Sequence, residues 1–148
     1  GAGAAAGGAG VDEVAEVVSG LVPRTRIFAA LDTLENLKKG GRVGGAQALV
    51  GSMLSIKPVI QVVDGKVESE SRQRTRGRAL RYLADKVHQF EQVENLAVLH
   101  GNAPDVDQLL ELLGDGRRRD DVVVGDVGAV IGTHAGPRVI GVTFHVPR

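Results

Sequence analysis

The spacing of apolar residues predicts a chain in which helices and short strands alternate. Apolar residues recur every three or four positions over 11–21, which predicts an amphipathic helix that stops at Pro23. Runs of valine, isoleucine and phenylalanine predict strands between the helices. The expected strands lie within 24–32, 55–63, 66–72, 95–101 and 139–146, with two more short ones, separated by a break, within 120–136. The further helices are expected at 33–39, in the last part of 40–54, at about 75–92 and at 103–116.

Turn and cap residues define several of these boundaries. Asp64-Gly65 separates two β-rich runs and suits the tight turn of a hairpin. Pro58 places the first strand of that hairpin at a sheet edge, or marks the start of the strand. Asp32 or Thr33 is expected to cap the helix that follows. Further helix boundaries are expected at Gly40-Gly41, at Pro104 in a first turn, and at Gly114.

Strands that alternate with helices predict an α/β domain, in which helices cover a mainly parallel or mixed sheet. Residues 1–10 contain only glycine and alanine. We expect them to be a flexible lead-in or remnant, or a piece of a Gly/Ala-rich helix. Residues 11–148 then form one domain, long enough to bury a core.

Composition narrows the classes of function. Lys plus Arg and Asp plus Glu both number 18, so no net field favours nucleic acid or an anionic membrane. The chain has no Cys, which excludes disulfides and thiolate metal sites and fits a cytoplasmic protein. No apolar run approaches the ~18 residues of a membrane span. Aromatic residues make up 3% of the chain, so base stacking on aromatic side chains is not expected.

The first stretch with candidate chemistry is LKKGGRVGG, at 37–45. Adjacent glycines let a backbone approach a ligand closely, and Arg42 directly after them offers a planar fork for a carboxylate or phosphate. The pattern matches neither GxGxxG nor GxxxxGK[ST], the two nucleotide-binding fingerprints. By itself it favours a helix C-cap with a solvated arginine over a ligand loop by roughly two to one.

The second stretch, IGTHAGPRVIG at 131–141, holds His134 between glycines. This predicts a tight loop at a strand end, where ligand groups gather in α/β sheets. No metal site is expected, because no partner stands at metal-binding spacing. No GxSxG elbow marks a serine nucleophile. The residues alone leave His134 as a catalytic group, a ligand contact or a turn histidine. The remaining histidines, expected on the surface or in strands, are His88, His100 and His145.

Five arginines lie within RQRTRGRALR, at 72–81, around the start of a predicted helix. Positive charge is unfavourable at that end of a helix. A nucleic acid, an acidic protein surface and a plain solvated face all remain open as explanations.

Taken in order, these motifs resemble the DegV family of fatty-acid-binding proteins. DTLENLKKGGR, the IKPV strand, the DG hairpin and the arginine stretch match one signature, and IGTHAGP matches the family's G-x-H-x-G-P. The match runs from about Val11 to the C-terminus and covers only the second half of the family's length. The family's N-terminal lobe supplies a Thr and a Ser to the carboxylate. Arg138 departs from the pattern, which has Gly after the Pro; if that position has positive φ, the arginine strains the loop or the loop differs.

The resemblance implies a non-enzymatic carrier that binds a long-chain fatty acid in an apolar slot, needs no cofactor, and presents its ligand to a fatty acid kinase subunit. Arg42 and His134 match the family residues expected near the carboxylate, with Gly41 and Gly136 beside them. An added charge at Arg138 would also favour an anionic head group. The residues implied for the tail slot are Leu49, Met53 and Ile56, and those implied for docking the kinase are Arg74 and Arg76.

Two other functions remain as alternatives. One is an enzyme of phosphoryl or acyl transfer, with His134 as base and Arg42 as anion clamp, although no nucleophile stands out. The other is a nucleic-acid-binding module that uses 72–81, against which the zero net charge and scarce aromatics weigh.

Overall fold

Six strands form one mixed sheet. The computed structural model describes residues 1–49, 56–114 and 121–147, apart from the side chains of residues 48 and 49. The strands are β1 (Thr25–Ala30), β2 (Lys57–Val63), β3 (Lys66–Gln73), β4 (Glu94–His100), β5 (Val123–Asp126) and β6 (Ile140–His145). Their order across the sheet is β3-β2-β1-β6-β4-β5. β4 and β5 run parallel, and every other neighbouring pair is antiparallel. The predicted α/β class with a mixed sheet is confirmed.

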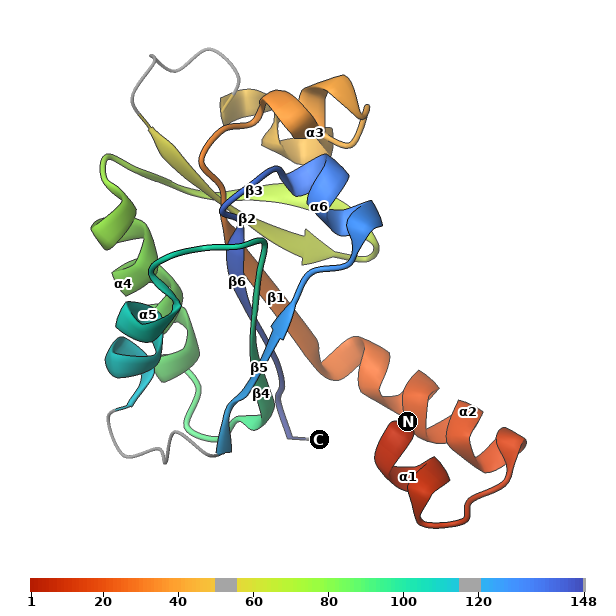
Figure 1. Ribbon diagram of the computed structural model, residues 1–148. Coiled ribbons are helices and arrows are strands. Elements are labelled where there is room, and N and C mark those ends of the chain that lie inside the picture. The colour runs from red at the N-terminus through yellow and green to blue at the C-terminus, as the bar shows by residue number, and fades with distance from the viewer. Residues whose placement is uncertain (50–55, 115–120, 148) are drawn as a thin grey trace.

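Helices cover both faces of this sheet, with α4 and α5 on one face and α3 and α6 on the other (Figure 1). The helices are α1 (Ala2–Ala6), α2 (Val11–Leu21), α3 (Glu35–Lys39), α4 (Arg76–His88), α5 (Val106–Leu113) and α6 (Ala129–Ala135). Two short 3-10 helices are η1 (Val22–Arg24) and η2 (Gly44–Leu49). In the part of the chain that the structure describes, no helix combines the length and the apolar character that crossing a bilayer requires.

The main core lies between the sheet and the α4–α5 pair. Strand alternation turns Phe144 of β6 toward these helices, where it is fully buried. Its ring centroid lies 6.3 Å from that of Phe28 and 5.3 Å from that of Phe90. Helix α4 fills this core with residues that include Leu80, Leu83 and Val87. This core anchors β1, which precedes α3, and β6, which follows α6.

A second, smaller cluster covers one end of the opposite face. Leu31 and Leu37, from the segment after β1, pack with Ala135 and Val139, which lie at the end of α6 and just before β6. α3 and α6 therefore lie against each other where β1 ends and β6 begins (Figure 1). Farther along this face no helix of the described residues packs on the sheet, and Ile27 of β1 stays 37% exposed.

The predicted hairpin is confirmed, whereas the predicted cap of α3 is not. Asp64 and Gly65 have φ of 49° and 73°, the left-handed pair of a tight turn between β2 and β3. Pro58 lies at the start of β2, which is an inner strand of the sheet. The N-cap of α3 is Leu34, without a side-chain cap bond, and Thr33 lies one residue earlier, where its Oγ1 accepts from the backbone N of Glu35 at 3.2 Å.

The expectation of a second short strand within 120–136 is wrong, because residues 129–135 form helix α6. The backbone N of Gly132 donates to Gly128 O at 2.9 Å, and that of Gly136 donates to Gly132 O at 2.8 Å. The apolar pair that reads as a strand, Val130 and Ile131, is 73% and 58% exposed, so the run is not a buried strand. His134 accordingly lies in the last turn of a helix and not in a loop at a strand end.

Two predicted helix boundaries also shift. The helix expected at 75–92 ends at His88, and Phe90 follows in a turn with its backbone N bonded to Val87 O at 3.2 Å. Pro104 precedes the N-cap Asp105 and so lies outside the first turn of α5.

At the N-terminal end, residues 1–10 contain α1, and α2 extends away from the sheet and buries none of its residues (Figure 1).

Candidate functional site

Helix α3 ends in a turn that accounts for the glycines of LKKGGR. The backbone N of Gly41 donates to Lys38 O at 3.1 Å, and that of Arg42 donates to Leu37 O at 2.8 Å, the bond pair of a Schellman motif. Gly41 has a φ of +65°, the left-handed conformation that such a turn requires. The predicted C-cap is confirmed, and the turn holds Arg42 directly beyond the end of the helix.

The side chain of Arg42 folds back over this turn. Its Nη1 donates to Gly40 O at 3.0 Å, and the residue is exposed. The guanidinium forms no further bond to any described residue, so most of its five N–H donors remain available to an anion.

His134 of α6 packs against the same turn. A Cβ added to Gly40 would collide with Nδ1 of the imidazole and would lie 2.7 Å from its Cε1. Nδ1 is buried in this contact and has no hydrogen-bond partner within the described ranges. The residue as a whole is half-buried, which leaves Nε2 as the accessible ring nitrogen.

A reciprocal contact joins the two helices a little farther along. Gly136, at the end of α6, has a φ of +85°, and a Cβ there would collide with Nδ2 of Asn36 in α3. α3 and α6 thus interlock, with His134 against Gly40 and Asn36 against Gly136. The structure brings the predicted head-group residues of two distant motifs to one place.

Arg138 keeps the left-handed backbone expected of a glycine at that position. Its φ is 62°, a conformation that costs an ordinary residue about 1–2 kcal/mol. Both main-chain groups are bonded: N donates to Gly101 O at 2.8 Å, and O accepts from Arg76 Nη2 at 2.7 Å. The half-exposed side chain places Nε 3.4 Å from Oδ2 of Asp32. The arginine therefore has a left-handed backbone whose N–H and C=O are both bonded.

Arg76 is the centre of an ion-pair network. Its Nε and Nη2 donate to the carboxylate of Asp105 at 2.7 and 3.0 Å, and its Nη1 lies 3.4 Å from Asp32 Oδ1. Lys57 Nζ approaches the same oxygen at 3.2 Å. The hydrogen bond from Arg76 holds the pKa of Asp105 below its ordinary value, although burial acts in the opposite direction. With its side chain 14% exposed, Arg76 ties the start of α4 to the segments after β1 and before α5.

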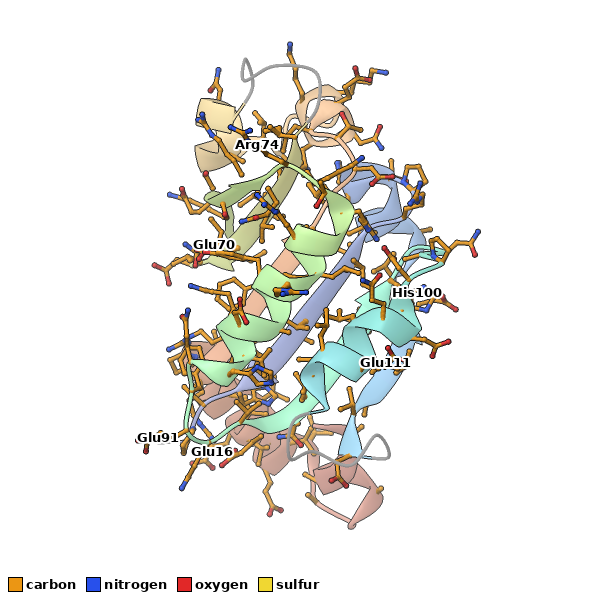
Figure 2. The ribbon with its side chains drawn as sticks, turned by 90° about the vertical axis from the view of Figure 1, so that its left-hand side faces the viewer. Glu16, Glu70, Arg74, Glu91, His100 and Glu111 are labelled. Carbon is orange, nitrogen blue, oxygen red and sulfur yellow. The ribbon has the colours of Figure 1, made fainter. Side chains whose placement is uncertain are left out.

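The two predicted docking residues therefore lie in different surroundings. Arg76 forms hydrogen bonds and ion pairs within the chain. Arg74 is exposed and forms no hydrogen bond or ion pair with a described residue. Figure 2 shows Arg74 near the start of α4, on the face that α4 and α5 cover.

The predicted tail slot is described only at Ile56, which is half-buried directly before β2. The side chain of Leu49 and the whole of Met53 lie outside the described residues. A separate open groove of about 610 Å³ lies at the far end of β1, between η1 and the β2–β3 turn. It runs along β1 as far as Phe28, so only Ala29 and Ala30 of this strand lie between the groove and the segment that leads to α3. Apolar residues that line this groove include Val22, Ile27 and Val62.

Sequence reasoning missed several residues of this region. The sequence predicts Asp32 only as a helix cap, whereas the structure makes it the shared acceptor of three cations. Its place at the end of the strand expected within 24–32 was the usable signal, since polar groups at strand ends often gather. Asn36 and the steric role of Gly40 carry no signal in a single sequence. In the ranges that the structure describes, no three His, Cys, Asp or Glu side chains are placed to share a metal ion.

Comparison with known proteins assigns this arrangement to a family. The model of the DegV family, described as uncharacterised proteins, matches residues 1–146. The chain belongs to the DegV family. A DegV domain-containing protein of Clostridium perfringens is 35% identical over 147 residues, which cover 97% of this chain and 52% of that relative. The resemblance seen in the motifs is confirmed.

Solved DegV structures share the fold. A fatty-acid-binding DegV family protein of Thermus thermophilus has a TM-score of 0.83 at 29% identity, covering 97% of this chain and 53% of its own. A fatty-acid-binding DegV protein of Streptococcus agalactiae has a TM-score of 0.82 at 28% identity, covering 98% and 53%. The chain thus spans about half the length of the DegV proteins it matches.

Proposed function

We propose that this DegV chain is part of a protein that binds one long-chain fatty acid, with Arg42 and His134 holding the carboxylate. The observation that carries the proposal is that both side chains contact Gly40, although they come from different motifs. Two DegV proteins of the same fold are described as binding fatty acids, which supports the choice of ligand.

The chemistry of the two side chains suits a carboxylate. A carboxylate that leaves water needs hydrogen-bond donors and a counter-charge. Arg42 offers both, and His134 offers a donor at Nε2. A hydrogen bond to a charged group contributes about 1.5–3 kcal/mol, so the pair can hold the head group in place while the tail supplies most of the affinity.

The tail is proposed to lie in the apolar slot predicted at Leu49, Met53 and Ile56. Burial of each methylene contributes about 0.8 kcal/mol, so a long acyl chain dominates binding once a slot encloses it. Because this chain spans about half the length of its relatives, we expect the second wall of the slot, and further donors to the carboxylate, from the part that it does not span.

A carrier role fits the site better than catalysis. A catalytic histidine is normally oriented by a second group bonded to its other ring nitrogen. Nδ1 of His134 faces Gly40 and has no such partner among the described residues. We therefore propose a ligand contact at His134, without a cofactor.

Presentation of the bound fatty acid to a kinase subunit is the further part of the proposal. Arg74 is exposed and unpaired within the described ranges, so it can contribute to contact with an acidic surface of a partner. Arg76 would act there only indirectly, through the position of the segment that carries Arg74.

Native mass spectrometry of the complete gene product, purified from cells, tests the proposal. The expected result is an added mass of one fatty acid, and uptake of labelled palmitate or oleate after the lipid has been removed. A protein that carries no lipid and takes up neither fatty acid would overturn the proposed function.

A further inference from the structure

Gly40 is a glycine that its own backbone does not require. Its φ of −80° and ψ of −1° are open to any residue, and alanine is the better helix former at such a position. The obstacle to a side chain is steric, since a Cβ would collide with His134 and would lie 3.2 Å from Asn36 O. The next residue is the reverse case: Gly41 has a φ of +65°, and a Cβ there would meet nothing within 4 Å. The two adjacent glycines therefore serve different purposes.

The contact with Gly40 also determines which ring nitrogen of His134 carries the proton. Nδ1 is buried and has no acceptor within the described residues, so a proton there would be an unpaired buried donor. A bare nitrogen lone pair facing an aliphatic C–H group is a weakly favourable contact. A neutral imidazole has its proton on one nitrogen only, which leaves that proton on Nε2.

We infer that Gly40 is a positioning residue for the head-group site: it seats the imidazole of His134 so that Nε2–H is the donor presented to the ligand. The identity of that ligand as a fatty-acid carboxylate rests on the proposed function.

Gly40 serves Arg42 as well, through a different atom. Its carbonyl oxygen accepts from Arg42 Nη1 at 3.0 Å, and because the φ and ψ of Gly40 are open to alanine, we expect the turn after α3 to persist in Gly40→Ala. Gly40→Ala therefore separates the two effects: it displaces His134 and preserves the Arg42 contact. We also expect the Asn36–Gly136 contact, which holds α3 against α6, to persist in this variant.

A double-mutant cycle in the complete gene product measures whether Gly40 acts through His134. The variants are Gly40→Ala, His134→Ala and the double variant, and the readout is the dissociation constant for oleate. We expect each single variant to lose roughly 10- to 100-fold in affinity, as the loss of a hydrogen bond to a charged group implies. The double variant should bind about as well as His134→Ala alone, because the displaced ring is already absent.

Gly77→Ala is the matched control. A Cβ on this α4 glycine would lie 3.9 Å from Gln108 Nε2, an ordinary contact, and would meet no atom of α3 or α6 within 4 Å. Its affinity for oleate should equal that of the wild type.

Nuclear magnetic resonance of the lipid-free protein, labelled with ¹⁵N at histidine, tests the position and the tautomer of the His134 ring without any ligand. The His134 ring, assigned from the His134→Ala spectrum, should show a protonated Nε2 and a bare Nδ1, and Gly40→Ala should shift both signals. The inference is overturned if Gly40→Ala binds oleate like the wild type, if it weakens binding equally with and without His134, or if the seated ring carries its proton on Nδ1. A wild type that binds no fatty acid would defeat the proposed function, while the ring spectra would still decide the role of Gly40.

Discussion

Replacement of Arg76 with methionine separates structural stability from partner docking. The guanidinium donates twice to Asp105, at 2.7 and 3.0 Å, and once to Arg138 O at 2.7 Å, and the side chains of Arg76 and Asp105 are 14% and 15% exposed. Methionine retains an apolar stem but no donor. Breaking a buried ion pair costs about 3–5 kcal/mol, and partial solvent access at this site reduces the expected loss of unfolding free energy to about 2–3 kcal/mol.

Urea denaturation of the complete gene product at neutral pH measures this loss. Arg74→Met is the matched control, because Arg74 is exposed and unpaired among the described residues, and its effect should stay within about 0.5 kcal/mol. If Arg76→Met destabilises no more than Arg74→Met, the network does not hold these segments together.

The pH dependence of the same variant gives an independent check. Arg76 lowers the pKa of Asp105 in the folded state, so the stability from this carboxyl is present above its ordinary value of 3.8 and is lost as the pH falls through the folded value. Arg76→Met removes that contribution. The stability difference between wild type and variant should therefore narrow on acidification below the ordinary value, and a difference that stays constant or widens would contradict the assignment.

Three other predictions concern single positions. Gly136→Ala should lower the free energy of unfolding by about 1–2 kcal/mol or more, because its φ is +85° and Asn36 occupies the Cβ position. Gly132→Ala should cause no such loss, because the nearest atom to its Cβ, Val127 Cγ2, would lie 3.9 Å away. Tyr82 is the single tyrosine, and burial and its bond to Glu70 raise its pKa to about 12, so an ultraviolet titration should find its midpoint there. The stability linked to this phenol is complete below its ordinary value of 10 and is lost as the pH rises toward 12; a midpoint near 10 would refute the buried environment. Arg74→Glu should reduce transfer of bound fatty acid to a kinase subunit while leaving oleate affinity unchanged, and loss of both together would argue against a docking role.

Periodicity and turn chemistry were sufficient for most of the fold. The Asp64-Gly65 hairpin, the C-cap at Gly41 and the buried stripe of α4 depend on local conformation or on one apolar face, and both leave marks in a single sequence. Helix α6 could not be predicted in this way, because Val130 and Ile131 form a short apolar run typical of a strand, although both are exposed on the helix.

The candidate site was predictable only in part, because its contacts join segments that are distant in sequence. The motifs point to Arg42 and His134 separately. That they share Gly40 depends on the packing of α3 on α6, which no local pattern encodes. Likewise, the sequence of the basic stretch at 72–81 does not distinguish its five arginines from one another. Tertiary structure does, because it packs Arg76 against Asp105 and leaves Arg74 exposed.

Calorimetric titration of the complete, lipid-free gene product with oleate measures whether Arg42 binds the fatty-acid carboxylate. Lys39→Ala is the matched control, since Lys39 is an exposed cation one turn before Arg42 with no bond to a described residue. We expect Arg42→Ala to weaken binding at least roughly ten-fold, as loss of a charge-assisted hydrogen bond requires, and Lys39→Ala to change it by less than about two-fold. Equal affinities for Arg42→Ala and Lys39→Ala would contradict the assignment of the carboxylate to this turn.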